Sequence, residues 1–283
     1  MSWKKYILTQ LLVMGFIGAF ATAKGPNILI FNGDTISVYL NLLPDDFYEI
    51  DTVRFNSTEH INRTLNVSLF GDEQTCWTTG CFDVFQTTWE IENNQLYLTG
   101  INSCCYDRDS LKADLTLLFK EKVINGKVKA DWISTKVIAQ DWKDFLFYYS
   151  DYLIFRKEME LEFLEGKLLN INTLDNSKSR QSVYSQDATQ LSNFIHTHID
   201  WNNLPKIQKP FRVLVQFSAN EDGNVDKIEI MRKSDNEIFN QEAVRVIKLI
   251  PDWDIVFYRG QLFRSRYNMP ITFSEENREK YGK

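Results

Sequence analysis

One stretch limits the possible folds of this chain more than any other, because it predicts a strand, a turn, a second strand and a helix with few residues between them. It runs from residue 211 to residue 253 and reads FRVLVQFSANEDGNVDKIEIMRKSDNEIFNQEAVRVIKLIPDW. Alternate residues of its first part are apolar, which predicts a strand with one buried face; these residues are Phe211, Val213, Val215 and Phe217. Asp222-Gly223 predicts a tight turn, because glycine adopts positive φ without strain. The return strand is expected around Val225, Ile228 and Ile230.

The helix that follows is predicted from apolar residues at helical spacing, namely Ile238, Ala243, Val246, Ile247 and Ile250. Asp235 or Asn236 is expected to cap its start, and Pro251 is expected to end it. A last strand is predicted at YNMPITF (Tyr267 to Phe273), with Gly260 in the turn region before it. The end of the chain is therefore predicted to be a small α+β unit with an antiparallel sheet.

The region before this unit is predicted to be rich in antiparallel strands. Three segments alternate apolar and polar residues around a short turn sequence: Thr87 to Ile101 around Asn93-Asn94, Leu118 to Ile133 around Asn125-Gly126, and Met159 to Ile171 around Glu165-Gly166. Asparagine and glycine tolerate the positive φ that tight hairpins require. Three hairpins at similar spacing favour a meander or a partial barrel over a parallel sheet.

The length and composition fit two folded domains, since the chain has 283 residues and 43% of them are hydrophobic. The predicted fold class is α+β. We expect a signal peptide at residues 1–23, a β-rich domain at 24–171, a polar linker at 172–189 and a second domain at 190–283. The second domain would begin with a helix, because Leu191, Phe194, Ile195 and Ile199 have helical spacing.

The first residues have the layout of a secretory signal peptide. Lys4 and Lys5 precede a mostly apolar run, and Ala21-Thr22-Ala23 matches the small-x-small pattern of a cleavage site. We expect cleavage after Ala23 and a periplasmic or secreted protein. The alternative is an uncleaved anchor in the inner membrane, although the apolar run is short for a membrane span.

The cysteines of the chain are Cys76, Cys81, Cys104 and Cys105, which all lie in the first predicted domain. An even number of cysteines in an exported chain favours disulfides. A bond between the neighbours Cys104 and Cys105 would strain the backbone, so both are expected to pair with Cys76 and Cys81. A zinc site is the alternative, but the adjacent pair departs from the usual C-x₂₋₄-C spacing.

The segment from Gln140 to Glu158, QDWKDFLFYYSDYLIFRKE, is dense in aromatic residues. Its periodicity does not distinguish a buried strand from a short helix. Such a cluster could line a ligand pocket, but it more often belongs to a core.

The composition and motifs argue against several functional classes. The 38 acidic and 32 basic residues give a net charge of −6, without the basic footprint of a nucleic-acid-binding protein. His196 and His198 are two positions apart on the expected helix, so they face different directions. No metalloprotease, serine-hydrolase or phosphate-loop motif is present, and we expect no enzyme, no cofactor and no metal. A pair of catalytic carboxylates in the first domain stays as an alternative, which would make the protein a cell-envelope hydrolase.

The C-terminal segment resembles the C-terminal domain of the TonB family. The matching features are the strand VLVQF, the turn EDGNV, the strand KIEIM, the segment QEAVRVIKLIPDW, Gly260 and the closing MPITF. The preceding helix and IDWNNLP fit the form common in Bacteroidetes-type members. The resemblance covers about residues 190–274, and the order and spacing of these features are more specific than any one of them.

This resemblance implies a periplasmic domain that adds a short extended peptide of an outer-membrane transporter to the edge of its sheet. By the family's plan the peptide pairs beside the last strand, here Arg264 to Phe273. The residues expected at this edge are Arg264, Arg266, Tyr267, Asn268, Met269, Ile271 and Phe273. Pro270 suits an edge position, because it has no N–H to donate to a ladder. Arg264 and Arg266 either steer an acidic peptide or are solvated.

The chain departs from the energy-transducing members of the family. Those members keep an uncleaved N-terminal helix and a proline-rich spacer, whereas here only Pro26 and Pro44 precede Pro205. We therefore expect an exported protein-interaction protein that binds a peptide or a partner's strand by β-augmentation. The alternative is a membrane-anchored component that transmits energy to outer-membrane transport.

Overall fold

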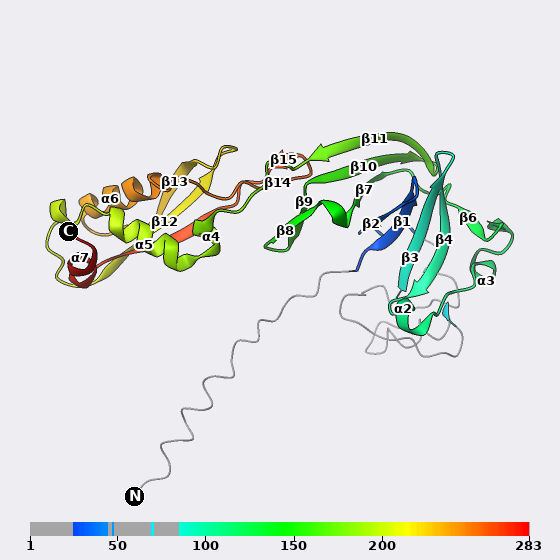
Figure 1. The fold of residues 1–283 in the computed structure, drawn as a ribbon, viewed down its shortest axis with the longest axis horizontal. Helices are drawn as coiled ribbons and strands as arrows, with labels where there is room; N and C mark the ends of the chain where they lie inside the picture. Colours follow the sequence, from blue (N-terminus) through cyan, green and yellow to red (C-terminus); the bar gives the residue numbers. More distant parts are fainter. Residues whose placement is uncertain (1–24, 45–46, 48–68, 71–84, 283) are drawn as a thin grey trace, which may run out of the picture. The chain divides into compact units, whose positions relative to one another are not determined.

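The structure is a computed structural model, and it describes residues 25–44, 47, 69, 70 and 85–282 (Figure 1). The predicted leader, Cys76 and Cys81 lie outside the described residues. The chain divides into two compact units. Of the described residues, the first unit comprises those up to Thr135 together with 163–168, and the second comprises 136–162 and 169–282. No helix in the described part of the chain has the length and apolar character needed to cross a membrane.

The first unit is built on a β-sheet with the strand order β2-β1-β3-β4-β6-β5. Its strands are β1 (Asn27–Phe31), β2 (Asp34–Val38), β3 (Phe85–Glu92), β4 (Gln95–Ser103), β5 (Val123–Ile124) and β6 (Lys127–Lys129). Its helices are α2 (Tyr106–Asp109), α3 (Leu115–Phe119) and the 3₁₀ turn η3 (Lys120–Lys122). β3 and β4 form the long hairpin that the sequence predicts. The hairpin predicted at Leu118 to Ile133 is confirmed only around Asn125-Gly126, where β5 and β6 pair, because residues 118–122 are helical in α3 and η3.

The hairpin turns of the first unit have the backbone geometry that their residues predict. Asn93 and Asn94 both adopt positive φ, at 51° and 61°, and so do Asn125 and Gly126, at 53° and 77°. One strand pairing was not predicted. β1 runs parallel to β3, with Ile28 opposite Thr88. The hairpin signals report only neighbouring strands, so a pairing between distant segments gives no local pattern.

The core of the first unit forms around aromatic side chains. Trp89 on β3 is completely buried, and Leu96 and Leu98 on β4 are buried with it. Phe119 stacks on Trp132 with ring centroids 6.2 Å apart, and the indole N–H of Trp132 donates to the carbonyl of Leu42 at 2.8 Å. Burial of these rings supplies much of the stabilisation of this unit.

The second unit begins with strands within and beside the aromatic segment. They are β7 (Lys136–Gln140), β8 (Phe145–Tyr149), β9 (Tyr152–Phe155), β10 (Lys157–Leu164) and β11 (Lys167–Asp175), and the 3₁₀ turn η4 (Trp142–Asp144) precedes β8. The end of β10, the start of β11 and the turn between them belong to the first unit. The aromatic segment forms the β8–β9 hairpin, which decides between the strand and the helix that the sequence left open. Glu165 and Gly166 form the turn between β10 and β11 with positive φ, as predicted.

The segment expected as a linker contains ordered structure. β11 extends to Asp175, and the short helix α4 (Val183–Gln186) follows. Asn176 is buried, and its side-chain amide donates to Glu158 Oε2 at 2.9 Å while its side-chain oxygen accepts from the Gly260 N–H at 2.8 Å. The predicted boundaries of the domains stay a prediction.

The C-terminal part of the second unit contains the predicted α+β arrangement (Figure 1). Its strands are β12 (Phe211–Ala219), β13 (Val225–Arg232), β14 (Phe257–Tyr258), β15 (Gln261–Leu262) and β16 (Tyr267–Phe273). Its helices are α5 (Ala188–His198), α6 (Glu237–Lys248), α7 (Glu275–Tyr281) and the 3₁₀ turn η5 (Trp201–Asn203). β13, β12 and β16 form an antiparallel sheet in that order, which we call the C-terminal sheet. The mixed α+β class is confirmed.

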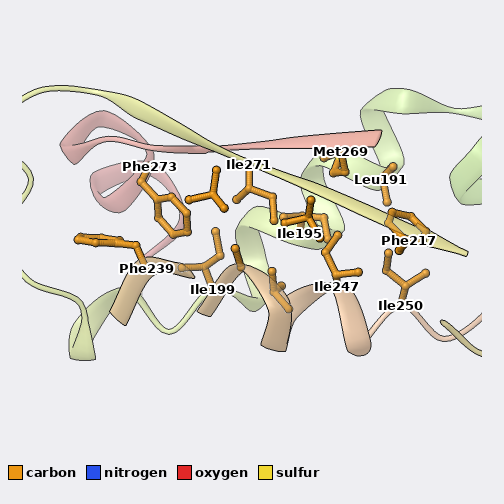
Figure 2. Packing of buried hydrophobic residues seen from close by; sticks show 14 of the residues in the cluster. Leu191, Ile195, Ile199, Phe217, Phe239, Ile247, Ile250, Met269, Ile271 and Phe273 are labelled. Carbon is orange, nitrogen blue, oxygen red and sulfur yellow. The ribbon is translucent and has the colours of Figure 1, made fainter. Parts of the chain in front are cut away.

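Apolar side chains of α5, of α6 and of the inner face of the C-terminal sheet form one hydrophobic core. Figure 2 shows Phe239 and Phe273 at one end of this core and Phe217 and Ile250 at the other. The predicted helical stripe is wrong at Ile238, which is 50% exposed, because the neighbouring Phe239 is the buried residue of that turn. The opposite face of the sheet carries Leu214 and Pro270 among polar side chains such as Arg212, Gln216 and Asn268.

Candidate functional site

The strand β16 lies at the edge of the C-terminal sheet and is the strand that the sequence predicts as an interaction site. Among the described residues it has a neighbouring strand on one side only. It pairs with β12 through seven consecutive residue pairs, from Phe211–Phe273 to Phe217–Tyr267, without a register shift. A regular edge of this kind presents backbone N–H and C=O groups that a further strand can use.

The side chains of β16 divide between the core and the solvent. Met269, Ile271 and Phe273 are buried, and Ile271 and Phe273 have no exposed surface. Asn268 and Pro270 are exposed, and Asn268 accepts a hydrogen bond from the Gln216 side chain at 3.0 Å on the solvent face. A strand added beside β16 would therefore extend a sheet that already has one dry face and one wet face.

Two observations indicate which backbone groups of β16 point away from β12. The carbonyl of Thr272 accepts a hydrogen bond from the Asn277 side chain at 3.1 Å, so this group points outward. Groups that point to one side of an antiparallel strand recur every second residue, so Asn268 and Pro270 share this direction. Pro270 is consistent with this assignment, because a proline whose backbone faced β12 would leave one position of the ladder without a donor.

The outward edge of β16 therefore offers only some of the backbone donors and acceptors that a regular strand would offer. By this alternation Asn268 directs both its N–H and its C=O away from β12, and Pro270 directs a C=O alone. Thr272 presents its N–H, while its C=O already has the Asn277 amide. A partner strand would find two donors, at Asn268 and Thr272, separated by a proline.

The two arginines that were predicted at this edge have different surroundings. β16 begins at Tyr267, so Arg264 precedes the strand that was expected to start there. Its Nη1 lies 2.9 Å from both carboxylate oxygens of Asp226, which belongs to β13 at the other edge of the sheet. Arg266 is exposed, and its Nη1 donates to Gln216 Oε1 at 3.5 Å. Of the two, Arg266 is the one whose charge has no acidic partner in the described part of the chain.

Local sequence signals hold the ends of β16 in place. Ser274 caps α7 directly after the strand and accepts from the Asn277 N–H at 3.1 Å. Arg278 on α7 donates to the carbonyls of Trp201, Leu204 and Pro205 at 2.8, 3.0 and 2.6 Å. Asn277 and Arg278 were not predicted from the sequence, although Ser274 followed three residues later by Asn277 resembles a capping pattern that could have indicated them.

A half-buried carboxyl group lies elsewhere in the second unit, at Asp254. Burial raises its pKa, while hydrogen bonds from the Ser185 hydroxyl at 2.6 Å and the Ser182 N–H at 2.7 Å favour its charged form. Burial also raises the pKa of Tyr149. The hydrogen bonds of Asp254 with Ser182 and Ser185 connect α4 to the segment after α6, so we assign this carboxyl group a structural role.

The remaining candidate residues have no common site. The Nδ1 atoms of His196 and His198 each lie within hydrogen-bonding distance of a backbone carbonyl of α5, at 2.7 and 2.8 Å. No group of three or more His, Cys, Asp or Glu residues within the described ranges could hold a metal ion. Neither Cys104 nor Cys105 is a free thiol. Their pairing with Cys76 and Cys81 stays a prediction, because those two residues lie outside the described ranges.

Comparison with known protein families adds one finding. Residues 212–274 match the family model described as Gram-negative bacterial TonB protein C-terminal. The chain contains a TonB C-terminal domain. The matched segment begins at the second residue of β12 and ends directly after β16, so it contains nearly all of β12 and the whole of β13, α6 and β16.

The TonB domain accounts for less than a third of the chain, since it covers 63 of the 283 residues (212–274). Helix α5 and the IDWNNLP segment lie outside the matched residues, so the Bacteroidetes-type form stays a prediction. The comparisons with curated proteins and with solved structures gave no match.

Proposed function

We propose that this protein is an exported interaction protein whose TonB domain binds an extended segment of a partner protein along β16. The observation that carries the proposal is the regular outer edge of β16, with outward backbone donors at Asn268 and Thr272. Backbone hydrogen bonds would supply much of the affinity, and side chains next to the edge would supply selectivity.

The chemistry of the edge supports an extended peptide more than a small molecule. β16 has no charged side chain in the sequence YNMPITF, so a peptide would approach without desolvating a charge. Arg266 lies just before the strand, and its unpaired charge would attract an acidic residue of the peptide. Arg264 would act differently, by fastening the preceding loop to Asp226.

The family match supports a partner in the cell envelope. TonB C-terminal domains act in the envelope of Gram-negative bacteria and contact proteins such as outer-membrane receptors, and they bind rather than catalyse. A receptor segment is therefore the first partner to test, and the periplasm is the compartment in which the two would meet. Neither binding along β16 nor cleavage of the leader requires a cofactor.

The test places a proline at position 268 of β16, where the backbone N–H is expected to point away from β12. Asn268→Pro removes one outward N–H, and Pro270 already occupies the same phase of the strand. Asn268→Ala is the matched control, because it removes the same side chain and keeps the N–H. Binding of short peptides from periplasmic segments of outer-membrane receptors would be measured by calorimetry with the chain from Lys24 onward.

The two variants should separate backbone pairing from side-chain contact. We expect Asn268→Pro to weaken binding at least about fivefold, since a hydrogen bond contributes about 1 kcal/mol. Asn268→Ala should bind within about twofold of the natural chain, because exposed side chains contribute little. Equal binding by the proline variant and the natural chain would contradict the proposal, provided that both retain the same circular dichroism spectrum.

A further inference from the structure

A second candidate site lies in the same unit, at the end of the C-terminal sheet where β12 begins and β13 ends. A hollow of about 530 Å³ opens there. Its rim carries four basic side chains, which are Lys209, Arg212, Arg232 and Lys233. We propose that this cationic hollow binds a phosphate-bearing ligand, and that it does so independently of peptide binding at β16.

The inner side of the cationic hollow is aromatic and well packed. Phe211 and Phe239 line it, with ring centroids 5.0 Å apart and nearly perpendicular rings. Phe273 supports both rings, at 5.6 Å from Phe211 and 5.1 Å from Phe239. Figure 2 shows Phe239 and Phe273 together at this end of the core. Because Phe239 and Phe273 are buried, they give the hollow a rigid base that does not have to form when a ligand binds.

One wall of the hollow is the loop between β13 and α6, and a buried amide holds this loop in shape. Asn240 is only 1% exposed. Its side-chain oxygen accepts from the Ser234 N–H at 2.8 Å, and its side-chain amide donates to the Ser234 carbonyl at 3.1 Å. Asn236 uses its own side chain to cap α6 at the Ile238 N–H. The loop is therefore fixed by internal bonds, and the basic groups beside it remain available.

The basic side chains of the rim have no acidic partner in the described part of the chain, whereas four other arginines of this unit do. Arg180, Arg245, Arg264 and Arg278 each form an ion pair with a nearby carboxylate. None of the four rim cations has an ion pair or a side-chain hydrogen bond within the described residues, and all four are exposed. Asp235 is the one acidic residue of the lining. Like charges brought together in this way repel one another, and a bound anion would relieve that repulsion.

The combination of charges favours phosphate over a single carboxylate. Two guanidinium groups and two ammonium groups exceed what one carboxylate would neutralise, whereas a phosphate or diphosphate carries several charges and accepts bidentate bonds from arginine. The chain has a net charge of −6, so a local excess of basic groups is not a consequence of its composition. The volume exceeds that of one inorganic phosphate, and the aromatic side would contact an organic portion of the ligand.

This chemistry has two sources in a cell envelope, namely soluble phosphorylated compounds and the headgroups of phospholipids. The test uses inorganic pyrophosphate as the soluble probe and vesicles of phosphatidylglycerol in phosphatidylcholine as the lipid probe. Calorimetry would measure the first and co-sedimentation the second, with the chain from Lys24 onward. The variant is Arg212→Gln with Arg232→Gln. The control is Lys227→Gln with Lys248→Gln, which removes two positive charges from exposed positions outside the hollow.

We expect the natural chain to bind one of these probes and the arginine variant to bind it at least about tenfold more weakly, because the variant loses two guanidinium groups that would donate charge-assisted hydrogen bonds to phosphate. The lysine control should weaken binding less than about threefold, because salt screens the attraction between the ligand and distant charges. Pyrophosphate binding would assign a soluble ligand, and binding to vesicles alone would assign a headgroup. Failure of both probes, an equal loss in the control, or preferential binding of an aspartate-rich peptide would overturn the proposal. Peptide binding at β16 is measured separately, so the two sites can fail independently.

Discussion

The two edge strands of the C-terminal sheet, β13 and β16, flank the same central strand but present different surfaces. β13 carries Asp226, Lys227, Glu229 and Arg232, and its ladder with β12 has two register shifts. β16 carries no charge, and its ladder with β12 is continuous. Charged side chains and bulges are the means by which proteins prevent unwanted strand pairing. The difference supports the proposal that β13 is protected against pairing and that β16 is the edge available to a partner.

Both edges depend on one hydrophobic core, and the largest expected effect comes from removing a ring from it. Phe273 has no exposed surface and contacts Trp201, Phe211 and Phe239. Phe273→Ala should lower the free energy of unfolding by about 3–5 kcal/mol, because it removes buried surface and leaves a cavity. Urea denaturation measures this. The neighbouring Thr272→Ala should cost less than about 1 kcal/mol, and similar values for the two variants would show that β16 is not anchored as described.

The protection of β13 can be removed without changing the net charge. Lys227→Thr with Glu229→Thr deletes one charge of each sign from the edge and introduces residues that favour strands. We expect increased self-association, seen in sedimentation velocity as a concentration-dependent rise in mass. Lys206→Thr with Glu221→Thr removes the same charges from exposed positions outside the strands. If the β13 variant sediments like this control, the charges do not protect the edge.

A donor can also be added to β16. Pro270→Ala would supply an outward N–H between those of Asn268 and Thr272, which completes the row that a partner strand would use. Affinity for a bound peptide should rise about fivefold, the equivalent of one hydrogen bond of about 1 kcal/mol. The measurement is calorimetry with the same peptide for both chains. Weaker binding by the alanine variant would contradict the assigned direction of the backbone groups.

The smallest effect is expected at the ion pair that connects the loop before β16 to β13. Arg264 and Asp226 are each about one-third exposed, so water screens their attraction. Asp226→Asn should lower the free energy of unfolding by less than about 1 kcal/mol and leave peptide affinity unchanged. Urea denaturation and calorimetry would check the two statements. A large loss of affinity would mean that Arg264 takes part in binding after all.

Local signals predicted β12, β13, α6 and β16 of the TonB domain, but not the short hairpin of β14 and β15. The alternation of Val213, Val215 and Phe217 predicts the inner face of β12, and these residues are buried. Gly223, in the Asp222-Gly223 turn, has φ of 86°, and a side chain there would meet the Asp252 carboxylate. Tight turns and strand alternation depend on residues close in sequence, so the local sequence is enough to predict them.

Long-range contacts could not be predicted in the same way. The partner of Arg264 lies 38 residues earlier in the chain, and no local pattern connects Arg264 with Asp226. The parallel pairing of β1 with β3 likewise joins segments that are distant in sequence. At the start of α6, Ile238 and Phe239 both suit an apolar stripe, and only the packing against Phe211 and Phe273 decides between them. The cationic hollow was missed for the same reason, since its basic residues come from two separate segments.

The most direct test of the account is amide hydrogen exchange along both edges of the C-terminal sheet, with and without a bound receptor peptide. New hydrogen bonds slow the exchange of the amides that form them. The account predicts slower exchange at Asn268 and Thr272 when the peptide is present, and unchanged exchange along β13. Protection that appears on β13 instead, or a bound peptide that leaves Asn268 and Thr272 unprotected, would contradict it.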